Sequence, residues 1–426
     1  MTFRYRRWMP EEIAPNVLSW ASELDELTRA QAAETAKLPI LAGHLALMPD
    51  AHLGKGASIG SVIPTESAVI PSAVGVDIGC GMAARRLDLT QDGLPDGLEA
   101  WVTQMEATVP AGLGRWHGGA SDEALGWFAA NPPPPTLDDP GRATAQLGTL
   151  GSGNHFIELA TDEDSRIWIL LHSGSRGGGN KLAGLHTKTA RRLHEGLGTR
   201  LQDPELAWLQ EGTKEFDAYI RDLRWSQAFA RENRRLMLAA THRAVETVLG
   251  REVATADEVN CHHNFTEREE HGGRMLWVTR KGAIRARVGD RGLIPGAMGQ
   301  RSYVIRGLGN EASYDSCAHG AGRRMSRRQA RKRLTLESFS EAMGVAVWQN
   351  ASARELLDEH PEAYKPIDVV MRDQADLVEI EHELHGIANY KGVERVGGRE
   401  PSDVRDRSDG VRRNGSTGSP RLRLNE

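Results

Sequence analysis

Val74-Gly75-Val76-Asp77-Ile78-Gly79-Cys80-Gly81-Met82 places a carboxylate and a thiol three residues apart on a backbone that carries three glycines. Glycine allows tight turns and close approach of the backbone, so both side chains can be directed at one point. A carboxylate and a thiol that converge in this way suit a metal site. The alternative is a glycine-rich turn after a buried strand, with Cys80 as a small core residue. The nine residues alone do not decide between the two interpretations.

Length and composition are typical of a soluble globular protein, with 426 residues, of which 39% are hydrophobic and 26% charged. The net charge of −5 argues against a surface that binds polyanions everywhere, so any nucleic-acid site is expected to be a local basic patch. The three cysteines form no CxxC pattern, which favours a reducing, cytoplasmic location over a disulfide framework. We find no signal peptide and no apolar run of about 18 residues, so no membrane association is expected.

Hydrophobic periodicity and glycine or proline punctuation predict an α+β chain. The basic residues between Arg323 and Arg333 would lie on a helix, either as a solvated face or as a contact to a phosphate backbone. The expected segments are a helix over 11–37, strands and turns over 40–89, a partly helical region over 95–130, a mostly solvated helical insertion (a lid or hairpin) over 181–249, strands near 259–265 and 277–280, a last ordered element ending near 392, and a disordered tail over 393–426.

Polar residues follow several predicted strands at a glycine or asparagine, a usual place for site residues. With the opening stretch they give five candidate metal ligands: Asp77, Cys80, His155, His172 and His263. A lone histidine is more often an ordinary core or surface residue, but the repeated setting favours a shared site. One thiolate, one carboxylate and three imidazoles suit transition metals, and suffice for two ions that share the sulfur. The softness of the ligands favours zinc without settling the metal.

A two-metal site typically handles phosphoryl groups. The sequence contains no GxxxxGK[ST] loop, no Lys-x-Asp-Gly of lysine-dependent nucleotidyltransferases, and no GxSxG elbow. For covalent catalysis the best candidate nucleophile is His319, because imidazole nitrogen can attack phosphorus and its small neighbours leave room. A binuclear metal-dependent phosphoesterase or nuclease acting on RNA, in which His319 does not react, is the alternative.

The motifs together resemble the RtcB family of GTP-dependent RNA ligases. They occur in the family's order from about residue 40 to 392, and the set is far more specific than any single glycine pattern. The matching motifs are Met48-Pro49-Asp50-Ala51-His52, 75–82, Gly153-Asn154-His155-Phe156, His172-Ser173-Gly174-Ser175-Arg176-Gly177, Cys261-His262-His263-Asn264, His319-Gly320-Ala321-Gly322-Arg323, Ala363-Tyr364-Lys365 and Tyr390-Lys391-Gly392.

The resemblance implies a single α+β catalytic domain over residues 1–392, with a central mixed β core and the charged helical insertion within it. It implies joining of RNA 3′-phosphate or 2′,3′-cyclic phosphate ends to 5′-hydroxyl ends, with GTP as cosubstrate and two Mn²⁺ per site. The RNA would be tRNA halves or cleaved RNA, in splicing or repair, and the resemblance leaves room for an accessory activator protein. Cys80 would bridge the two ions, one completed by His172 and His263 and the other by Asp77 and His155. His319 would carry the guanylate before it passes to the RNA.

Further roles follow from motif position. Glu158 would accept hydrogen bonds from guanine N1 and N2, which explains a preference for GTP over ATP. Asp50 matches another acidic active-site position, and Arg176 would contact RNA. Arg327, in the basic run after His319, would contact RNA as well. Ala297 stands where the family usually has serine, which removes a potential hydrogen bond to the nucleotide. The expected nucleotide-binding residues are Asn154, Glu158, Asn264, Ser302, Arg323, Tyr364 and Lys391.

Overall fold

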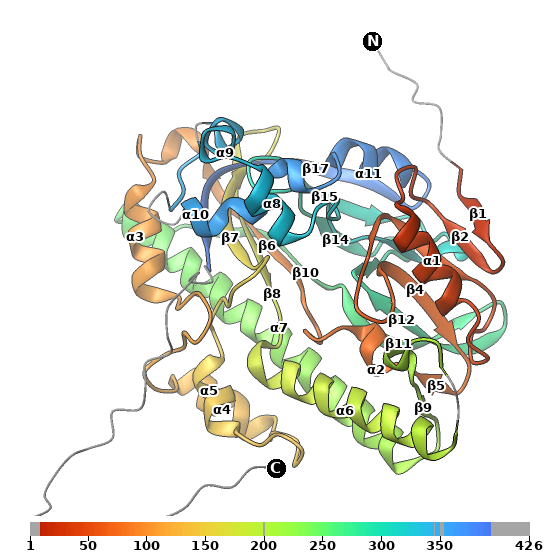
Figure 1. Cartoon of the computed structure of the whole chain (residues 1–426). Coiled ribbons are helices and arrows are strands. Elements are labelled where there is room, and N and C mark those ends of the chain that lie inside the picture. The colour runs from red at the N-terminus through yellow and green to blue at the C-terminus, as the bar shows by residue number, and fades with distance from the viewer. Residues whose placement is uncertain (1–8, 199–200, 345, 350–352, 393–426) are drawn as a thin grey trace, which may run out of the picture. The chain divides into compact units, whose positions relative to one another are not determined.

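Two β-sheets form the centre of the protein (Figure 1). The computed structural model describes residues 9–198, 201–344, 346–349 and 353–392; the expected tail over 393–426 lies outside them. The sheets have the orders β10-β6-β8-β7-β17-β15-β14 and β1-β2-β3-β4-β12-β11, and the pairs β13-β16 and β5-β9 are separate. The strands are β1 (Glu11–Ala14), β2 (Val17–Ser19), β3 (Leu45–His52), β4 (Ile59–Thr65), β5 (Ala68–Val69), β6 (Gly81–Thr90), β7 (Phe156–Thr161), β8 (Arg166–Ser173), β9 (Leu209–Gln210), β10 (Thr255–His262), β11 (Asn264–His271), β12 (Arg274–Lys281), β13 (Ala283–Arg285), β14 (Arg291–Ile294), β15 (Arg301–Gly307), β16 (Ser316–Ala318) and β17 (Val378–Lys391).

The seven-stranded sheet is antiparallel throughout, and its strands β7 and β8 are buried on both faces. Alternate side chains of a strand point to opposite faces, so Leu171 and Leu170 of β8 pack into two different apolar clusters. The edge strands β14 and β10 are joined by Arg291, which donates to both carboxylate oxygens of Asp257 at 2.9 and 2.7 Å. The sheet therefore offers a rigid support for residues at its strand ends.

Helices cover these sheets, so the predicted α+β class is confirmed. The two longest described helices, α6 and α7, run beside each other in the lower part of Figure 1. The helices are α1 (Glu26–Thr35), α2 (Pro71–Val74), α3 (Glu99–Thr108), α4 (Asp122–Ala130), α5 (Pro140–Gln146), α6 (Arg176–Gly196), α7 (Lys214–Leu249), α8 (Arg327–Arg333), α9 (Leu336–Met343), α10 (Ala353–Leu356) and α11 (Ile367–Asp373).

Helix α7 differs from the mostly solvated element that its charged sequence suggested. Its N-terminus is capped by Thr213, which accepts a hydrogen bond from the Phe216 amide at 3.3 Å, and it ends at Gly250 in the left-handed conformation. Between these caps it buries Met237 against β6, β8 and α3, and Phe229 against α4, α5 and α6. The apolar residues recur at helical spacing, so one face of α7 belongs to the core.

The helix expected over 11–37 is shorter than its periodicity suggested. The chain first forms the antiparallel pair β1-β2, whose turn contains Asn16 at φ +59°. Helix α1 begins only after Asp25, which caps it by accepting the amide hydrogen of Thr28 at 3.0 Å. Strand β2 pairs with β3, and this tertiary pairing outweighs the weak helical preference of the segment.

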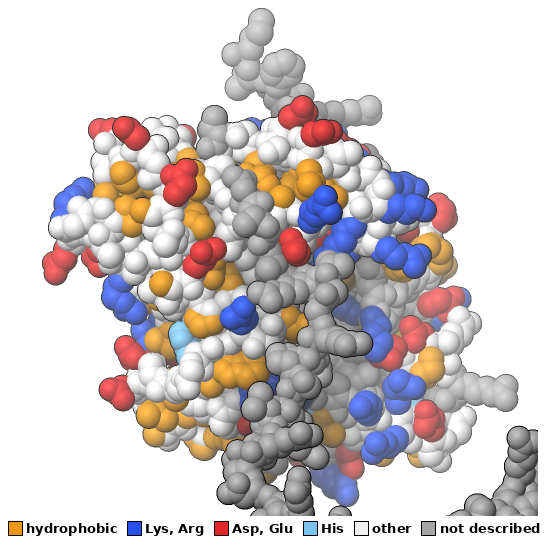
Figure 2. Space-filling model, turned by 60° about the vertical axis from the view of Figure 1, so that its left-hand side comes forward, with side chains coloured by type: hydrophobic (Ala, Val, Ile, Leu, Met, Phe, Trp, Pro, Cys, Tyr) orange, Lys and Arg blue, Asp and Glu red, His pale blue; other side chains and the backbone are white. Residues whose placement is uncertain are grey.

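The surface agrees with the composition. Acidic and basic side chains are interspersed on the face shown in Figure 2, rather than forming one continuous basic surface. No helix within the described ranges combines the length and hydropathy needed to cross a membrane. All described residues fall in one compact unit, Met1–Glu394.

Candidate metal and nucleotide site

The strand register of the seven-stranded sheet brings three candidate ligands to one place. Gly81, the first residue of β6, pairs with Ser173 at the end of β8 and with His262 at the end of β10. A Cβ atom on Gly81 would lie 2.1 Å from the carbonyl oxygen of Cys261, so this close approach requires glycine. The residues next to these three in sequence are the candidates Cys80, His172 and His263.

All five predicted ligands meet in one cluster. Cys80 Sγ lies 3.3 Å from Nε2 of His172 and 3.5 Å from Nε2 of His155. On one side, His172 Nε2 lies 3.3 Å from Nε2 of His263; on the other, His155 Nε2 lies 3.1 Å from Oδ2 of Asp77. The sulfur therefore stands between two groups of donors, and the cluster of Cys80, His155 and His172 is buried. This convergence fits metal binding and excludes the interpretation of Cys80 as an isolated core residue.

Backbone carbonyls orient two of the imidazoles. Nδ1 of His155 lies 2.9 Å from the carbonyl oxygen of Leu150, and Nδ1 of His172 lies 2.9 Å from that of Asn154. A carbonyl oxygen only accepts, so each Nδ1 carries a hydrogen, and each Nε2 faces the cluster. Nδ1 of His263 is buried and has no hydrogen-bond partner among the described residues. This arrangement of carbonyl, imidazole and donor cluster is typical of metal ligands.

Burial sets the protonation of the donors. It lowers the pKa of His172 and of His263 well below the usual value, so both imidazoles are neutral, as metal ligands must be. Burial opposes ionisation of Asp77, but the contact with His155 outweighs it and lowers the pKa of this carboxyl. Burial, and then the Asp77 carboxylate, raise the pKa of the Cys80 thiol well above its usual value. A thiolate at this position therefore requires a cation beside it.

His319 lies against the same cluster. Its ring centroid is 4.8 Å from that of His263, and its Nδ1 lies 2.5 Å from Oδ2 of Asp50. The same carboxylate oxygen accepts the amide hydrogens of His319 and Gly320 at 3.0 and 3.2 Å. A Cβ atom on Gly282 would lie 2.9 Å from Cε1 of His319, so this glycine makes room for the ring. Asp50 therefore holds both the backbone and the imidazole of the predicted nucleophile.

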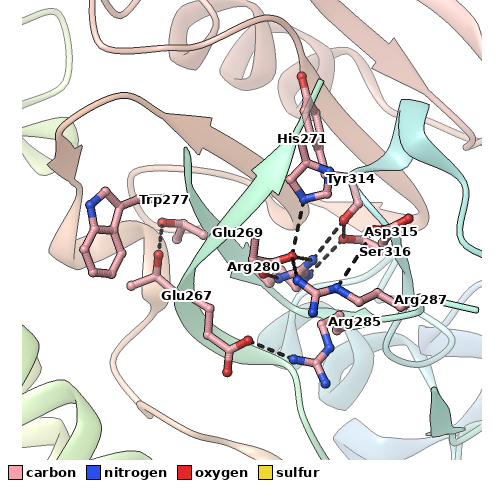
Figure 3. Close-up of polar contacts among 12 residues, drawn as sticks. Glu267, Glu269, His271, Trp277, Arg280, Arg285, Arg287, Tyr314, Asp315 and Ser316 are labelled. Carbon is pink, nitrogen blue, oxygen red and sulfur yellow. Dashed lines mark hydrogen bonds and ion pairs between the residues drawn. The ribbon is translucent and has the colours of Figure 1, made fainter. Parts of the chain in front are cut away.

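A buried ion pair anchors the strand that leads to His319 (Figure 3). Arg280 of β12 donates to both carboxylate oxygens of Glu269 of β11, and both side chains are excluded from solvent. The guanidinium also donates to Ser316 Oγ at 2.8 Å and to the carbonyl oxygen of Tyr314 at 2.9 Å. Ser316 begins β16, which ends one residue before His319. The pair thus fixes the backbone on the N-terminal side of that histidine.

A cavity of ≈ 400 Å³ opens beside the cluster. His172 and His319 form part of its wall, and Ala297, at the departure from the family pattern, lines it as well. Arg327, predicted to contact RNA, also faces the cavity, with Nε 3.6 Å from Oδ2 of Asp358. The predicted nucleotide-binding residues that line it are Asn154, Glu158, Ser302, Arg323, Tyr364 and Lys391.

Glu158 is a buried carboxyl in the cavity wall. Burial raises its pKa to about 7, although the Asn389 side chain donates a hydrogen bond to Oε2 at 2.9 Å. A Cβ atom on Gly386 would lie 2.8 Å from the carboxyl carbon, so glycine leaves space for the side chain. Asn389 was not among the predicted residues. Its position two residues before Lys391 puts both on one face of β17, so strand alternation would have indicated it.

A compact group of charges forms another part of the wall. Arg323 donates to the Tyr364 hydroxyl at 2.6 Å, and that hydroxyl donates to Oε2 of Glu359 at 2.7 Å. Lys391 Nζ lies 3.5 Å from the same oxygen. Burial opposes ionisation of Glu359, but the charges of Lys391 and Arg323 outweigh it and lower its pKa. No sequence pattern indicated Glu359, because it lies in a short helical turn without a neighbouring glycine.

Of the residues predicted to contact nucleotide or RNA, two do not line the cavity, Asn264 and Arg176. The Asn264 side chain donates to the carbonyl oxygen of Asp77 at 3.2 Å and accepts the amide hydrogen of Gly282 at 2.9 Å, so it braces the metal loop. Arg176 donates to Thr149 Oγ1 at 3.0 Å and is only partly exposed. Both residues support the ligand-bearing loops, and their predicted contacts with nucleotide and RNA remain predictions.

A buried cluster of sulfur, imidazole and carboxylate donors beside a charged cavity fits a metal-dependent enzyme. The chain matches the family model described as tRNA-splicing ligase RtcB over residues 31–128 and 123–392. It therefore belongs to the RtcB family of RNA ligases, and the family and enzyme class predicted from its motifs are confirmed.

Named relatives agree with the family match. The RNA-splicing ligase RtcB of Escherichia coli is 43% identical over 391 residues, which cover 85% of this chain and 94% of the relative. The tRNA-splicing ligase RtcB of Nanoarchaeum equitans is 31% identical over 426 residues, covering 82% and 87%. The RNA-splicing ligase RtcB of Mycobacterium tuberculosis is 30% identical over 416 residues, covering 80% and 94%.

Proposed function

We propose that this protein is a GTP- and Mn²⁺-dependent ligase that joins RNA 3′-phosphate or 2′,3′-cyclic phosphate ends to 5′-hydroxyl ends, in tRNA splicing or RNA repair. The observation that carries the proposal is the position of His319. Its ring lies 4.8 Å from that of His263, in the wall that the donor cluster shares with the cavity. A nucleophile so placed is within reach of both a bound triphosphate and the cations that would neutralise it.

Two Mn²⁺ ions that share Cys80 fit the donor set. Asp77 and His155 would complete one ion, and His172 and His263 the other, in keeping with the two groups of donors on either side of the sulfur. When bound, the ions neutralise phosphate oxygens. The protein's own part is to hold the imidazoles, the thiol and the carboxyl at fixed spacing before any cation arrives.

His319 would attack the α-phosphorus of GTP. Asp50 beside Nδ1 favours the proton there, which leaves the Nε2 lone pair for the attack. A bond forms between Nε2 and phosphorus while the bond to pyrophosphate breaks, and the carboxylate stabilises the positive charge on the ring. A cyclic phosphate would first be hydrolysed to a 3′-phosphate. The guanylate then passes to that phosphate, and the 5′-hydroxyl displaces GMP.

The residues of the cavity wall support the proposal that the nucleotide is a guanine nucleotide. An ionised Glu158 would accept the N1 and N2 hydrogens of guanine, which adenine cannot offer. The other proposed contacts come from the basic and polar wall residues Asn154, Ser302, Arg323, Tyr364 and Lys391.

Incubation with GTP labelled at the α-phosphate, in the presence of Mn²⁺, tests the proposal. The wild-type protein should acquire an acid-labile label, and the His319→Ala and Cys80→Ala variants should acquire none. Cys317→Ala, at a buried cysteine outside the donor cluster, is the matched control and should be labelled normally.

A ligation assay then compares RNA with 3′-phosphate, cyclic-phosphate and 3′-hydroxyl ends, with Mn²⁺, Zn²⁺ or Mg²⁺. Only the first two ends should be joined, with Mn²⁺ preferred. Metal-dependent hydrolysis of RNA without any protein label would refute the ligase mechanism and favour the binuclear phosphoesterase.

A further inference from the structure

Two adjacent polar side chains of α7, Asn233 and Arg234, are fully excluded from solvent directly behind the donor cluster. Charged side chains are almost never fully buried unless they are paired. Burial lowers the pKa of Arg234 to about 10, so the guanidinium still carries its charge at neutral pH. Among the described residues, its hydrogen-bond partners are backbone carbonyls, an amide and an imidazole rather than a carboxylate.

Arg234 connects three segments that are far apart in the sequence. Nη1 donates to the carbonyl oxygens of Gly79 and Ser173 at 2.9 and 3.0 Å. Nε donates to Oδ1 of Asn260 at 2.9 Å, and Nη2 lies 3.1 Å from Nδ1 of His262. Each segment carries a donor one residue away from a contacted position: Cys80, His172 and His263. One planar group therefore sets the spacing of three donors without touching any of them.

Asn233 holds the segment that orients a fourth donor. Its Oδ1 accepts the amide hydrogens of Gly148 and Thr149 at 2.8 and 3.1 Å, and its Nδ2 donates to the carbonyl oxygen of Thr149 and to Ser173 Oγ. The next residue, Leu150, supplies the carbonyl that receives the Nδ1 hydrogen of the fourth donor, His155. The Asn233 side-chain amide therefore links the segment before His155 to the end of β8, which carries His172.

We propose that Asn233 and Arg234 are a positioning pair, which fixes the spacing of the Cys80, His155, His172 and His263 donors so that the metal site is formed before metal binds. This inference rests on the proposed function in one respect: the donors must bind a metal. It does not require that the protein ligates RNA. The ammonium group of lysine keeps the positive charge of Arg234 but cannot make hydrogen bonds to three segments at once. Arg234→Lys therefore separates the effect of the guanidinium's geometry from the effect of its charge.

Calorimetric titration of the metal-free full chain with Mn²⁺ alone tests the pair, with circular dichroism and thermal melting to confirm folding. Arg234→Lys should bind Mn²⁺ about 10–100-fold more weakly, the usual cost of losing a group that orients metal ligands. Asn233→Ala, which leaves the charge unchanged, should weaken binding as well. Arg235→Lys is the matched control, because Arg235 is the next residue on α7, is half-exposed and pairs with Glu232; its affinity should equal that of the wild type.

Wild-type affinity in folded Arg234→Lys would overturn the proposal, because the positive charge alone would then suffice. Absence of folded protein for both variants would equally overturn it, since the pair would then support the fold rather than the site. Failure of the wild-type chain itself to bind metal would refute the proposed function and the pair together, whereas wild-type affinity in Arg234→Lys would refute the pair alone. The two failures are therefore distinguishable.

Discussion

Guanine binding should depend on pH through Glu158. Burial raises the pKa of this carboxyl to about 7, so the free protein holds a proton there below pH 7 and loses it above. A protonated carboxyl presents a donor to guanine N1–H, whereas the carboxylate accepts from both N1 and N2. The binding-competent form is therefore the ionised one, and affinity should fall as the pH falls through 7.

The size of the effect follows from the ionised fraction. With a pKa of about 7, roughly one carboxyl in eleven is ionised at pH 6 and roughly ten in eleven at pH 8, so the apparent dissociation constant should change by about tenfold. That change corresponds to about 1.4 kcal/mol of binding free energy. Calorimetric titration with GMP, which lacks a pyrophosphate leaving group and cannot react, measures it at each pH.

Glu158→Gln separates this carboxyl from every other titrating group, including the phosphate of GMP. At pH 8 the glutamine variant should bind GMP more weakly than the wild type does. Between pH 6 and pH 8 its dissociation constant should lack the tenfold change that Glu158 contributes in the wild type. Parallel pH profiles for the two proteins would refute the reasoning, as would tighter binding by the wild type at pH 6 than at pH 8.

Three other perturbations have defined outcomes. Glu269→Leu leaves the Arg280 guanidinium buried without its carboxylate, so the free energy of unfolding, measured by urea denaturation, should fall by about 3–5 kcal/mol. Glu66→Ala removes an exposed ion pair and should lower it by less than about 1 kcal/mol. Arg327→Ala should weaken RNA binding and reduce the slope of log affinity against log salt by about one; an unchanged slope would contradict an RNA contact. Asp50→Asn keeps an oxygen that can accept from the two amides and from Nδ1 but removes the negative charge that stabilises the guanylated imidazole, so self-guanylylation should fall by about a hundredfold while Mn²⁺ affinity is kept. Full labelling of that variant would remove Asp50 from the mechanism.

The sequence indicated that the five donors would meet, because Cys80, His155 and His263 adjoin glycine or asparagine, and Asp77 and His172 lie two residues from a glycine. Their binding of metal stays a prediction. The sequence did not predict Asn233 and Arg234, since a polar pair inside a long charged helix looks like part of a solvated face. Their role depends on which side of α7 meets the sheet, and only tertiary packing decides that. Glu359 was missed for a similar reason, because its partners Arg323 and Lys391 are distant in sequence.

Secondary structure was predicted least well where pairing partners are remote. Residues 11–19 form strands because β2 joins β3, a contact that periodicity within the segment cannot report. The strands that bear the site were easier, since their apolar runs are buried on both faces and end at glycine.

Strand β17 is the last described strand of the chain, yet it lies inside its sheet, between β7 and β15. During synthesis, the edges of β7 and β15 that pair with β17 stay unpaired until residue 391 has left the ribosome. Unpaired strand edges can pair with other chains and aggregate. Asn389 and Lys391 arrive on the same strand and complete the cavity wall. The growing polypeptide therefore completes its seven-stranded sheet and the wall of the cavity in the same late step.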